Sequence, residues 1–305
     1  MTNGTTASPT RLLVALDGSR LAETVLPLVR TLAAALGAQV TLLHVLEQQP
    51  PAMIHGEPHL TTLAGAEAYL DQVAAQLRGA GLIVTTHVHP NPERDVAASI
   101  AAHAAEMNAD LVALCAHGRG GIREWLVGRI PQQVAARAGR AVIIVPAPTE
   151  GDLSTIRRIV LPMDQAGEAM AALPLTQQLA GACGAELVLV TVVPTPGTMP
   201  GDAAAATVFL PHAAASLLDW AEDQARTTLQ QLAASLSAAG LAVKAEVRRG
   251  DIPRELVQAI TAHRADLVVM ATHARVGIEG LWAGSVAPRV TALAPCPVLL
   301  VPIRG

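Results

Sequence analysis

Two aspartates and two runs of small residues are the positions in this sequence whose types and spacing could do chemistry. Asp17 and Asp164 each follow a short aliphatic run. Later in each half, two groups of small residues are separated by nine positions: Cys115-Ala116-His117-Gly118 then Gly128-Arg129, and Ala271-Thr272-His273-Ala274 then Gly284-Ser285. Small side chains let the backbone approach a phosphate, and free N–H groups at a helix start donate to it. The pattern is typical of an anion-binding loop.

The chain repeats itself, so these groups occur at matching places in two copies. A shift of 147 positions joins the early pairs, and a shift of 156 joins the later ones. The matched pairs include Asp17 and Asp164, Val45 and Val192, His117 and His273, Arg119 and Arg275, Gly128 and Gly284, and Val145-Pro146 and Val301-Pro302. Because both shifts are collinear and preserve His, Arg, Gly and Pro, chance does not explain them. We expect two domains, residues 8–148 and 155–305.

Within each copy, short aliphatic runs alternate with helical patterns. In the first copy we predict strands at 12–16, 40–46, 83–88, 111–115 and 142–145. Strand–helix alternation of this kind predicts an α/β fold with a parallel sheet covered on both faces. Pro27 and Pro174 fall inside helical patterns, so each is expected in or near a first turn, or at a kink.

The loop spacing, the strand-end Asp, His44-Val45 and the terminal Cys296–Pro302 together resemble the universal stress protein family. That family has G-x-x-G, nine residues, then G-[ST] at this place, and the resemblance covers nearly all of both halves. It implies two doubly wound, Rossmann-like, five-stranded parallel sheets of strand order 3-2-1-4-5. Because the fifth strands would end at open edges, we expect the two copies to pair there as a pseudo-dimer within one chain. A homodimer of chains is compatible with this arrangement.

The resemblance also implies a ligand, ATP or a related adenine nucleotide, with or without Mg²⁺. The aspartate would lie beside the ribose or a phosphate-bound metal, the Val45 backbone would meet the adenine edge, and the loop would hold phosphates. In copy one the implied residues are Ala15, Leu16, Asp17, Val45, Leu114, Cys115, His117, Gly118, Arg119, Gly128, Arg129 and Ile130. In copy two they are Pro162, Met163, Asp164, Val192, Met270, Ala271, Ala274, Arg275, Gly284, Ser285 and Val286.

Both loops depart from the family pattern. Cys115 replaces the first glycine of copy one, and Arg129 replaces the hydroxyl residue, where it would either pair with phosphate or fill the pocket. Ala271 and Ala274 replace both glycines of copy two. If position 274 needs a positive φ, alanine costs roughly 1 kcal/mol there. The sequence therefore leaves open which copy binds nucleotide.

Several of these residues also have ordinary structural interpretations. Asp17 could be the N-cap of the following helix, and Val45 could belong to the core. His117 and His273 are expected to hydrogen-bond backbone, because no carboxylate or nucleophile accompanies them in the motif. Arg119 and Arg275 could lie near a phosphate or in solvent. No catalytic residue is expected, and ATP hydrolysis would be at most very slow.

Composition excludes several other classes of function. The chain is 51% hydrophobic with a net charge of −4, and no clustered basic face predicts nucleic-acid binding. With a single lysine, Lys244, it cannot contain a Walker P-loop, and neither G-x-G-x-x-G after a first strand nor G-x-S-x-G occurs. The apolar run 290–303 is short and broken by prolines, so no membrane span is expected. Three spaced cysteines without CxxC, and no visible signal peptide, predict a soluble cytoplasmic protein.

A metal site is not expected from the histidines. His87 and His89 would point from one strand face, while His55 and His59 lie in a separate loop. Together they could chelate a metal, but solvent-facing side chains are the favoured interpretation, and no HExxH or CxxC indicates zinc.

The leading hypothesis is a cytoplasmic stress-response regulator in which a bound adenine nucleotide orders the loops and changes partner binding. The rival is a protein-interaction or chaperone-like module that has lost its nucleotide. In that case the Pro- and Gly-rich segments Glu47 to Thr62 and Pro194 to His212 would carry partner specificity. A nucleotide-dependent enzyme of related fold lacks any recognisable catalytic constellation.

Overall fold

The computed structural model divides the chain into two compact units. It describes residues 10–117, 129–147, 152–164, 167–199, 211–273 and 286–303. Of these, residues 10–117 and 129–147 belong to the first unit, and 152–303 to the second. Among the described helices, none combines the length and apolarity needed to cross a bilayer.

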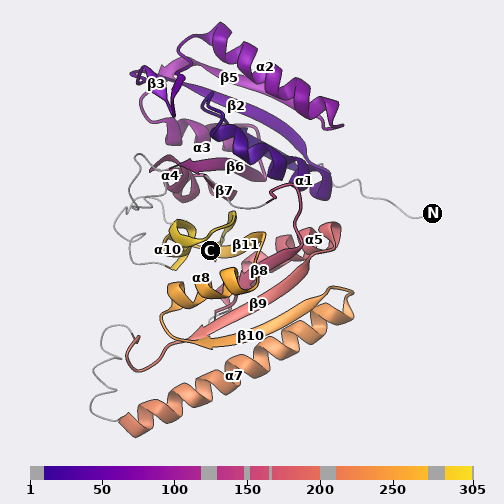
Figure 1. Ribbon diagram of the computed structural model, residues 1–305, viewed down its shortest axis with the longest axis vertical. Helices are drawn as coiled ribbons and strands as arrows, with labels where there is room; N and C mark the ends of the chain where they lie inside the picture. Colours follow the sequence, from indigo (N-terminus) through magenta and orange to yellow (C-terminus); the bar gives the residue numbers. More distant parts are fainter. Residues whose placement is uncertain are drawn as a thin grey trace, which may run out of the picture. The chain divides into compact units, whose positions relative to one another are not determined.

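The first unit is a parallel sheet with strand order β5-β2-β1-β6-β7 (Figure 1). Helices cover both faces, and α3 packs beside α4. Its elements are β1 (Arg11–Ala15), η1 (Ala22–Val25), α1 (Leu26–Leu36), β2 (Gln39–Glu47), β3 (Met53–Ile54), β4 (Glu57–Pro58), α2 (Leu63–Gly79), β5 (Val84–Glu93), α3 (Val96–Glu106), β6 (Leu111–His117), α4 (Arg129–Arg137) and β7 (Ala141–Ala147). The short strands β3 and β4 pair with each other as an antiparallel hairpin.

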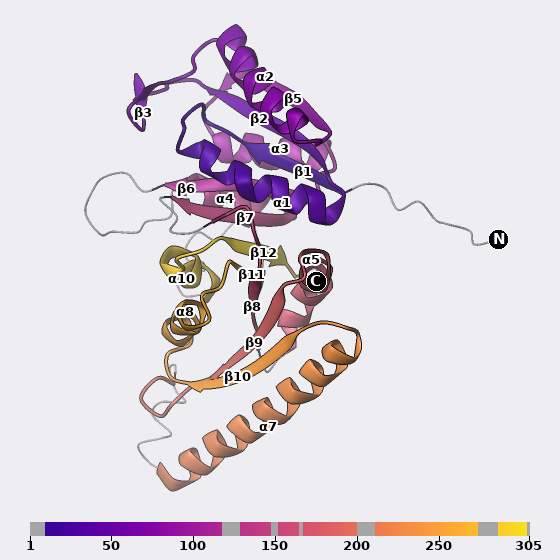
Figure 2. The ribbon, with the colours of Figure 1, turned by 45° about the vertical axis from the view of Figure 1, so that its right-hand side comes forward.

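The second unit repeats this topology with order β10-β9-β8-β11-β12 (Figure 2). Its elements are β8 (Arg158–Pro162), η2 (Glu168–Ala172), α5 (Leu173–Cys183), β9 (Glu186–Val193), α7 (Pro211–Ala238), β10 (Val243–Arg249), α8 (Ile252–Ala262), β11 (Leu267–Thr272), α10 (Val286–Leu293) and β12 (Val298–Pro302). Numbered along each unit, both sheets have the predicted order 3-2-1-4-5, and the predicted α/β fold is confirmed.

The first helices show how the repeated sequence sets repeated structure. Pro27 and Pro174 both lie in the first turn of their helices, α1 and α5, where no backbone N–H is needed. Gly37 and Gly184 end these helices with φ of 59° and 63°, the left-handed conformation that glycine adopts without strain. The prediction of a first-turn proline is confirmed in both copies.

The core is aliphatic, as the scarcity of aromatic residues requires. Leu12, Leu13 and Val14 of β1 are at most 1% exposed, because a central parallel strand is covered on both faces. The main difference from the predicted strands is β5, which runs on to Glu93 through two prolines. Since β5 is an edge strand, prolines at positions 90 and 92 are tolerated there.

Candidate functional site

In each unit the carboxyl ends of the strands meet at the point where the strand order reverses. The first strand of a unit lies between its second and fourth strands, so the chain continues to one side of it and later returns to the other. Such a switch point leaves a crevice in which α/β proteins bind ligands. The predicted residues at the ends of the first, second and fourth strands are therefore brought together in both copies.

In the second unit this crevice is an open cavity of about 560 Å³. That volume lies within the range of roughly 300–1,000 Å³ typical of small-molecule sites. All the copy-two residues that were predicted and are described line it: Pro162, Met163, Asp164, Val192, Met270, Ala271 and Val286. Its other lining residues are Glu168, Ala169, Thr191, Pro194, Ile252, Leu256, Thr272, His273, Ala287 and Ile303.

The walls of this cavity are mostly aliphatic. Val192 comes from the end of β9, Met270 from β11, and Ile252 and Leu256 from α8. An aliphatic lining of this kind is suited to an apolar ring. The cavity therefore has an apolar part suited to a base or another planar group.

The polar part of the cavity is built around Asp164. Its two carboxylate oxygens accept the backbone N–H groups of Glu168 and Ala169, at 3.2 and 2.9 Å, and so fix the start of η2. The N-cap interpretation is not confirmed, because the N-cap residue of η2 is Gly167; Asp164 instead accepts the first N–H groups of this helix from three residues further back. Because a carboxylate has several lone pairs, Asp164 keeps acceptor capacity toward the cavity.

His273 differs from its prediction. It was expected to hydrogen-bond backbone, but its Nε2 lies 2.7 Å from Oε2 of Glu168. The sequence hid this contact because Glu168 lies 105 positions away, at the start of η2. The cavity rim therefore carries a histidine–carboxylate pair beside Asp164.

The start of α10 forms another wall. Its first two residues, Val286 and Ala287, line the cavity. A helix N-terminus carries a partial positive charge and unpaired N–H groups, so anions are favoured beside it. This wall supplies the electrostatics that the predicted phosphate contacts require.

The first unit uses the matching residues for internal contacts. Oδ1 of Asp17 accepts the backbone N–H and the hydroxyl of Ser19 at 2.8 and 2.7 Å. The thiol of Cys115 donates to the carbonyl of Leu21 at 3.2 Å and lies 3.3 Å from the Thr24 hydroxyl. Burial raises the pKa of Cys115 to about 11, so it is a protonated structural thiol. Leu16, Val45 and Leu114 are buried in the core, Ala15 is half-buried, and Ile130 is exposed.

A short hairpin brings further side chains to the carboxyl end of β1. The turn between β3 and β4 has positive φ at His55 and Gly56, the geometry of a type I′ hairpin. From β4, Glu57 accepts the backbone N–H of Arg20 at 2.6 Å, and its other oxygen lies 3.4 Å from the Arg20 guanidinium. Just beyond, Leu60 packs so closely on Gly18 that an added Cβ would lie 2.6 Å from its Cδ1.

The same region is negatively charged. Tyr69 of α2 is surrounded by the carboxylates of Glu23, Asp17 and Glu57; its pKa is raised first by burial and then by these charges. Three carboxylates so close together oppose a polyphosphate. In the described part of the first unit, the residues just after β1 are therefore in contact with the hairpin segment and close to three carboxylates, whereas the strand ends of the second unit border a cavity.

Some predicted residues lie outside the described part of the chain. They are Gly118, Arg119, Gly128, Ala274, Arg275, Gly284 and Ser285. For His117 and Arg129 only the backbone is described, as the last residue of β6 and the first of α4.

Sequence reasoning missed two groups of residues. Ile252 and Leu256 line the cavity from α8, a helix that carries no part of the loop motif. Glu57 and Leu60 cover Gly18 and Arg20 from a segment assigned only to partner specificity. The position of Ile252 and Leu256 could have been predicted from the topology. In this fold the helix that follows the third strand begins at the carboxyl ends of the strands, where the candidate site lies.

Comparison with known proteins places both halves in one family. The profile of the Universal stress protein family matches residues 9–146 and again 155–302. Universal stress protein MJ0531 of Methanocaldococcus jannaschii is 40% identical over 62 residues, which are 20% of this chain and 36% of that protein. The match thus spans about a third of that curated relative's length.

Solved structures share the fold over almost the whole chain. A universal stress protein from Archaeoglobus fulgidus superposes with a TM-score of 0.70 at 17% identity, covering 97% of both chains. A protein of unknown function from Pseudomonas aeruginosa PAO1 gives a TM-score of 0.69 at 15% identity, covering 97% of this chain and 93% of its own. At these identities the likeness concerns the fold.

Proposed function

The chain belongs to the universal stress protein family, and from that premise we propose that it is a cytoplasmic regulatory protein that binds ATP or a related adenine nucleotide in its second unit. The observation that carries the proposal is the coincidence of a sequence pattern with a cavity. The copy-two residues implied by the family resemblance, where they are described, all line one space of about 560 Å³.

The cavity's chemistry supports a nucleotide in one orientation. The aliphatic residues Val192, Leu256 and Met270 provide the surfaces for adenine, while the start of α10 provides N–H groups for phosphates. Asp164 and Glu168 also line the cavity, so they would meet the ribose hydroxyls or a magnesium ion on the phosphates. A dication there would also offset the repulsion between two carboxylates and a polyphosphate.

We propose that the nucleotide is held as a signal and turned over at most very slowly. In this proposal the bound nucleotide is retained by the loops of the second unit. Its binding changes the surface that this unit offers to partner proteins. In the described lining, the His273–Glu168 pair and Asp164 could each accept a proton from water. Phosphate release should therefore be measured alongside binding.

For the first unit we propose the rival role, a module without nucleotide. The specific observation is the hairpin, with Leu60 on Gly18 and Glu57 on Arg20. The segment expected to carry partner specificity is in contact with the residues just after β1.

The proposal is tested with protein purified without added nucleotide. Denaturation followed by mass spectrometry should release up to one adenine nucleotide per chain. After its removal, MgATP at 100 times Kd should stabilise the protein by about 2.7 kcal/mol, raising Tm by roughly 5–10 °C. No released nucleotide, together with an unchanged Tm in millimolar MgATP, MgADP and AMP, would overturn it and favour an interaction module throughout.

A further inference from the structure

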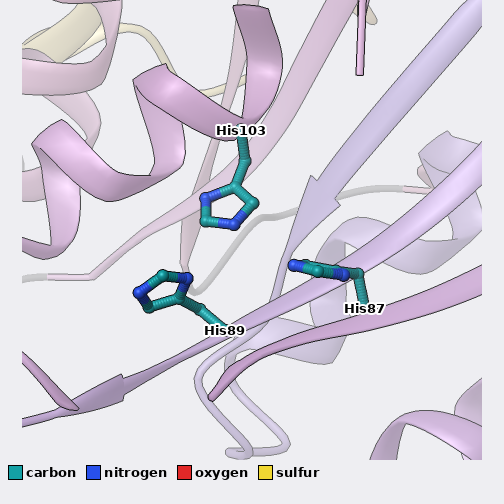
Figure 3. A group of neighbouring side chains, drawn as sticks. All are labelled: His87, His89 and His103. Carbon is teal, nitrogen blue, oxygen red and sulfur yellow. The ribbon is translucent and has the colours of Figure 1, made fainter. Parts of the chain in front are cut away.

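Three histidines converge in the first unit, outside the second-unit cavity that is proposed to bind nucleotide. His87 and His89 are two residues apart on the edge strand β5, so their side chains lie on the same face of the sheet. His103 comes from α3, which packs on that face (Figure 3). Its ring centroid lies 4.9 Å from that of each of the other two. One ring nitrogen from each histidine lies within 4.8 Å of the other two.

Hydrogen bonds fix the direction of the free nitrogens. Nδ1 of His103 lies 2.7 Å from the carbonyl oxygen of Ser99. Because a carbonyl only accepts, Nδ1 carries the proton and Nε2 keeps its lone pair. Figure 3 shows that this second nitrogen points toward His87 and His89. His103 is 6% exposed, so its ring is a buried polar group aimed into the cluster.

His89 is held in the same manner by a carboxylate. Its Nε2 lies 3.1 Å from Oε1 of Glu93, which leaves Nδ1 for a ligand. A ring N–H donated to a carboxylate or a backbone carbonyl is the usual support of a metal-binding histidine, because it fixes the tautomer and makes the other nitrogen more basic. Both kinds of support are present here, one on His89 and one on His103.

The second unit lacks this cluster at matching positions. In the first unit, His87 of β5 pairs with Leu43 of β2, and His89 pairs with Val45. The second-unit equivalents of Leu43 and Val45 are Val190 and Val192 of β9. Their partners on β10 are Glu246 and Arg248, not histidines. Arg248 there bridges to Glu246 and Glu255, and the equivalent of His103 under the 156-position shift is Ala259. The three histidines are therefore a feature of the first unit and not of the shared fold.

We propose that His87, His89 and His103 form a transition-metal site that binds Zn²⁺, with a water molecule as the fourth ligand. Imidazole nitrogens suit Zn²⁺, and three protein ligands leave one tetrahedral position open. Bonds of about 2.0–2.1 Å place ligand nitrogens about 3.4 Å apart, so small rotations of the half-buried His87 and His89 rings close the site. The carboxylates of Glu93 and Glu106 add negative charge around the dication. The half-buried rings of His87 and His89, each against His103, differ from the expectation that these side chains face solvent.

The test uses full-length, untagged protein stripped with chelator. Titration with Zn²⁺ against a competing chromophoric chelator should give one site per chain, and Co²⁺ in its place should give the intense visible absorption of tetrahedral coordination. His87→Gln and His89→Gln should each weaken Zn²⁺ binding at least about 10-fold, and Glu93→Gln should weaken it by roughly 10-fold through His89. His55→Gln and His263→Gln, outside the cluster, serve as controls and should bind normally.

His87 and His89 are partly exposed, so their variants should fold even where the buried His103→Gln does not. Circular dichroism of the stripped proteins checks this point. The proposal is overturned if the wild type binds less than one Zn²⁺ per chain under these conditions. It is equally overturned if folded His87→Gln and His89→Gln bind Zn²⁺ as the wild type does.

Discussion

The two units offer the same three strand ends but use them differently. In the second unit the ends of β8, β9 and β11 border an open cavity. In the first unit Leu60 and Glu57 contact the residues just after β1. We infer from this comparison that the connection between the second and third strands, and not the strand-end residues alone, distinguishes the two crevices.

The glycines after the first strands make this difference concrete. Gly18 has φ +92° and Leu60 against it, whereas Gly167 has φ +81° and nothing within 4 Å of an added Cβ. Both positions need a left-handed backbone, but only one is also covered. The two glycines do not occupy matching positions, because Gly18 directly follows Asp17 whereas Gly167 lies three residues after Asp164. The turns after the first strands have therefore diverged together with the packing on them.

The largest effect should come from filling the open cavity. Ala271→Leu puts a branched side chain into the lining, and we expect nucleotide affinity to fall by at least about 100-fold, roughly 2.7 kcal/mol. A substitution at the equivalent position of the first unit, Cys115→Ala, serves as the control and should leave affinity within about twofold. Isothermal titration with MgATP measures both, and equal losses in the two variants would erase the distinction between the units.

Removing the side chains that cover the residues after β1 tests the same comparison in the first unit. Glu57→Ala with Leu60→Ala removes both contacts of the covering segment, so we expect a second, weaker nucleotide site, with stoichiometry rising from one to two. The control, Leu63→Ala with Glu67→Ala, changes the same residue types at exposed positions. If the opened variant still binds one nucleotide, with the hairpin shown by hydrogen exchange to be released, the segment is not what closes the first unit.

Alanine substitution of Gly18 and of Gly167 should separate the effect of backbone strain on Tm from the effect of packing against Leu60. Gly18→Ala and Gly167→Ala each add roughly 1 kcal/mol of left-handed strain, which lowers Tm by about 2–4 °C. Gly18→Ala must also displace Leu60, so its Tm should fall further. Thermal unfolding with hydrogen exchange on peptides of each unit measures the two effects separately. Equal shifts would mean that Leu60 does not press on Gly18.

The smallest expected difference is in acid sensitivity. His44 is buried, and its Nδ1–H donates to the Leu16 carbonyl at 2.8 Å. Burial lowers its pKa, and its counterpart in the second unit is Thr191. Because the folded state binds a proton less readily than the unfolded chain, stability is full above about pH 6.5 and is lost as pH falls below it. One such proton contributes at most about 1.4 kcal/mol per pH unit.

The acid effect is measured by hydrogen exchange of each unit between pH 7.5 and pH 5. The first unit should lose protection on acidification, and His44→Thr should flatten that loss. An unchanged pH slope in this variant would remove His44 as its cause.

The fold was predictable because its signals are local and repeated. Pro27 and Gly37 mark the start and end of α1, and buried aliphatic runs mark the strands. The residues at the ends of β8 and β11 were predictable for the same reason, since strand ends of one topology always meet at the same edge. What a motif and its element order dictate could therefore be inferred from the sequence.

The remainder depends on contacts between distant segments. His273 meets Glu168 across 105 positions, and His103 joins His87 and His89 only because α3 packs on the edge strand. Leu60 meets Gly18 through a hairpin whose path is set by packing rather than by a motif. No spacing in the sequence encodes these approaches, since each depends on where two independently formed elements come to rest.

The central claim, that nucleotide occupies the second unit and not the first, is tested most directly by photoaffinity labelling. The full chain is irradiated with 8-azido-ATP and Mg²⁺, and labelled peptides are mapped by mass spectrometry with excess ATP as competitor. We predict competed labels in peptides of residues 158–194 and 252–273 and none in residues 11–60. Competed labelling confined to residues 11–60 would contradict the account.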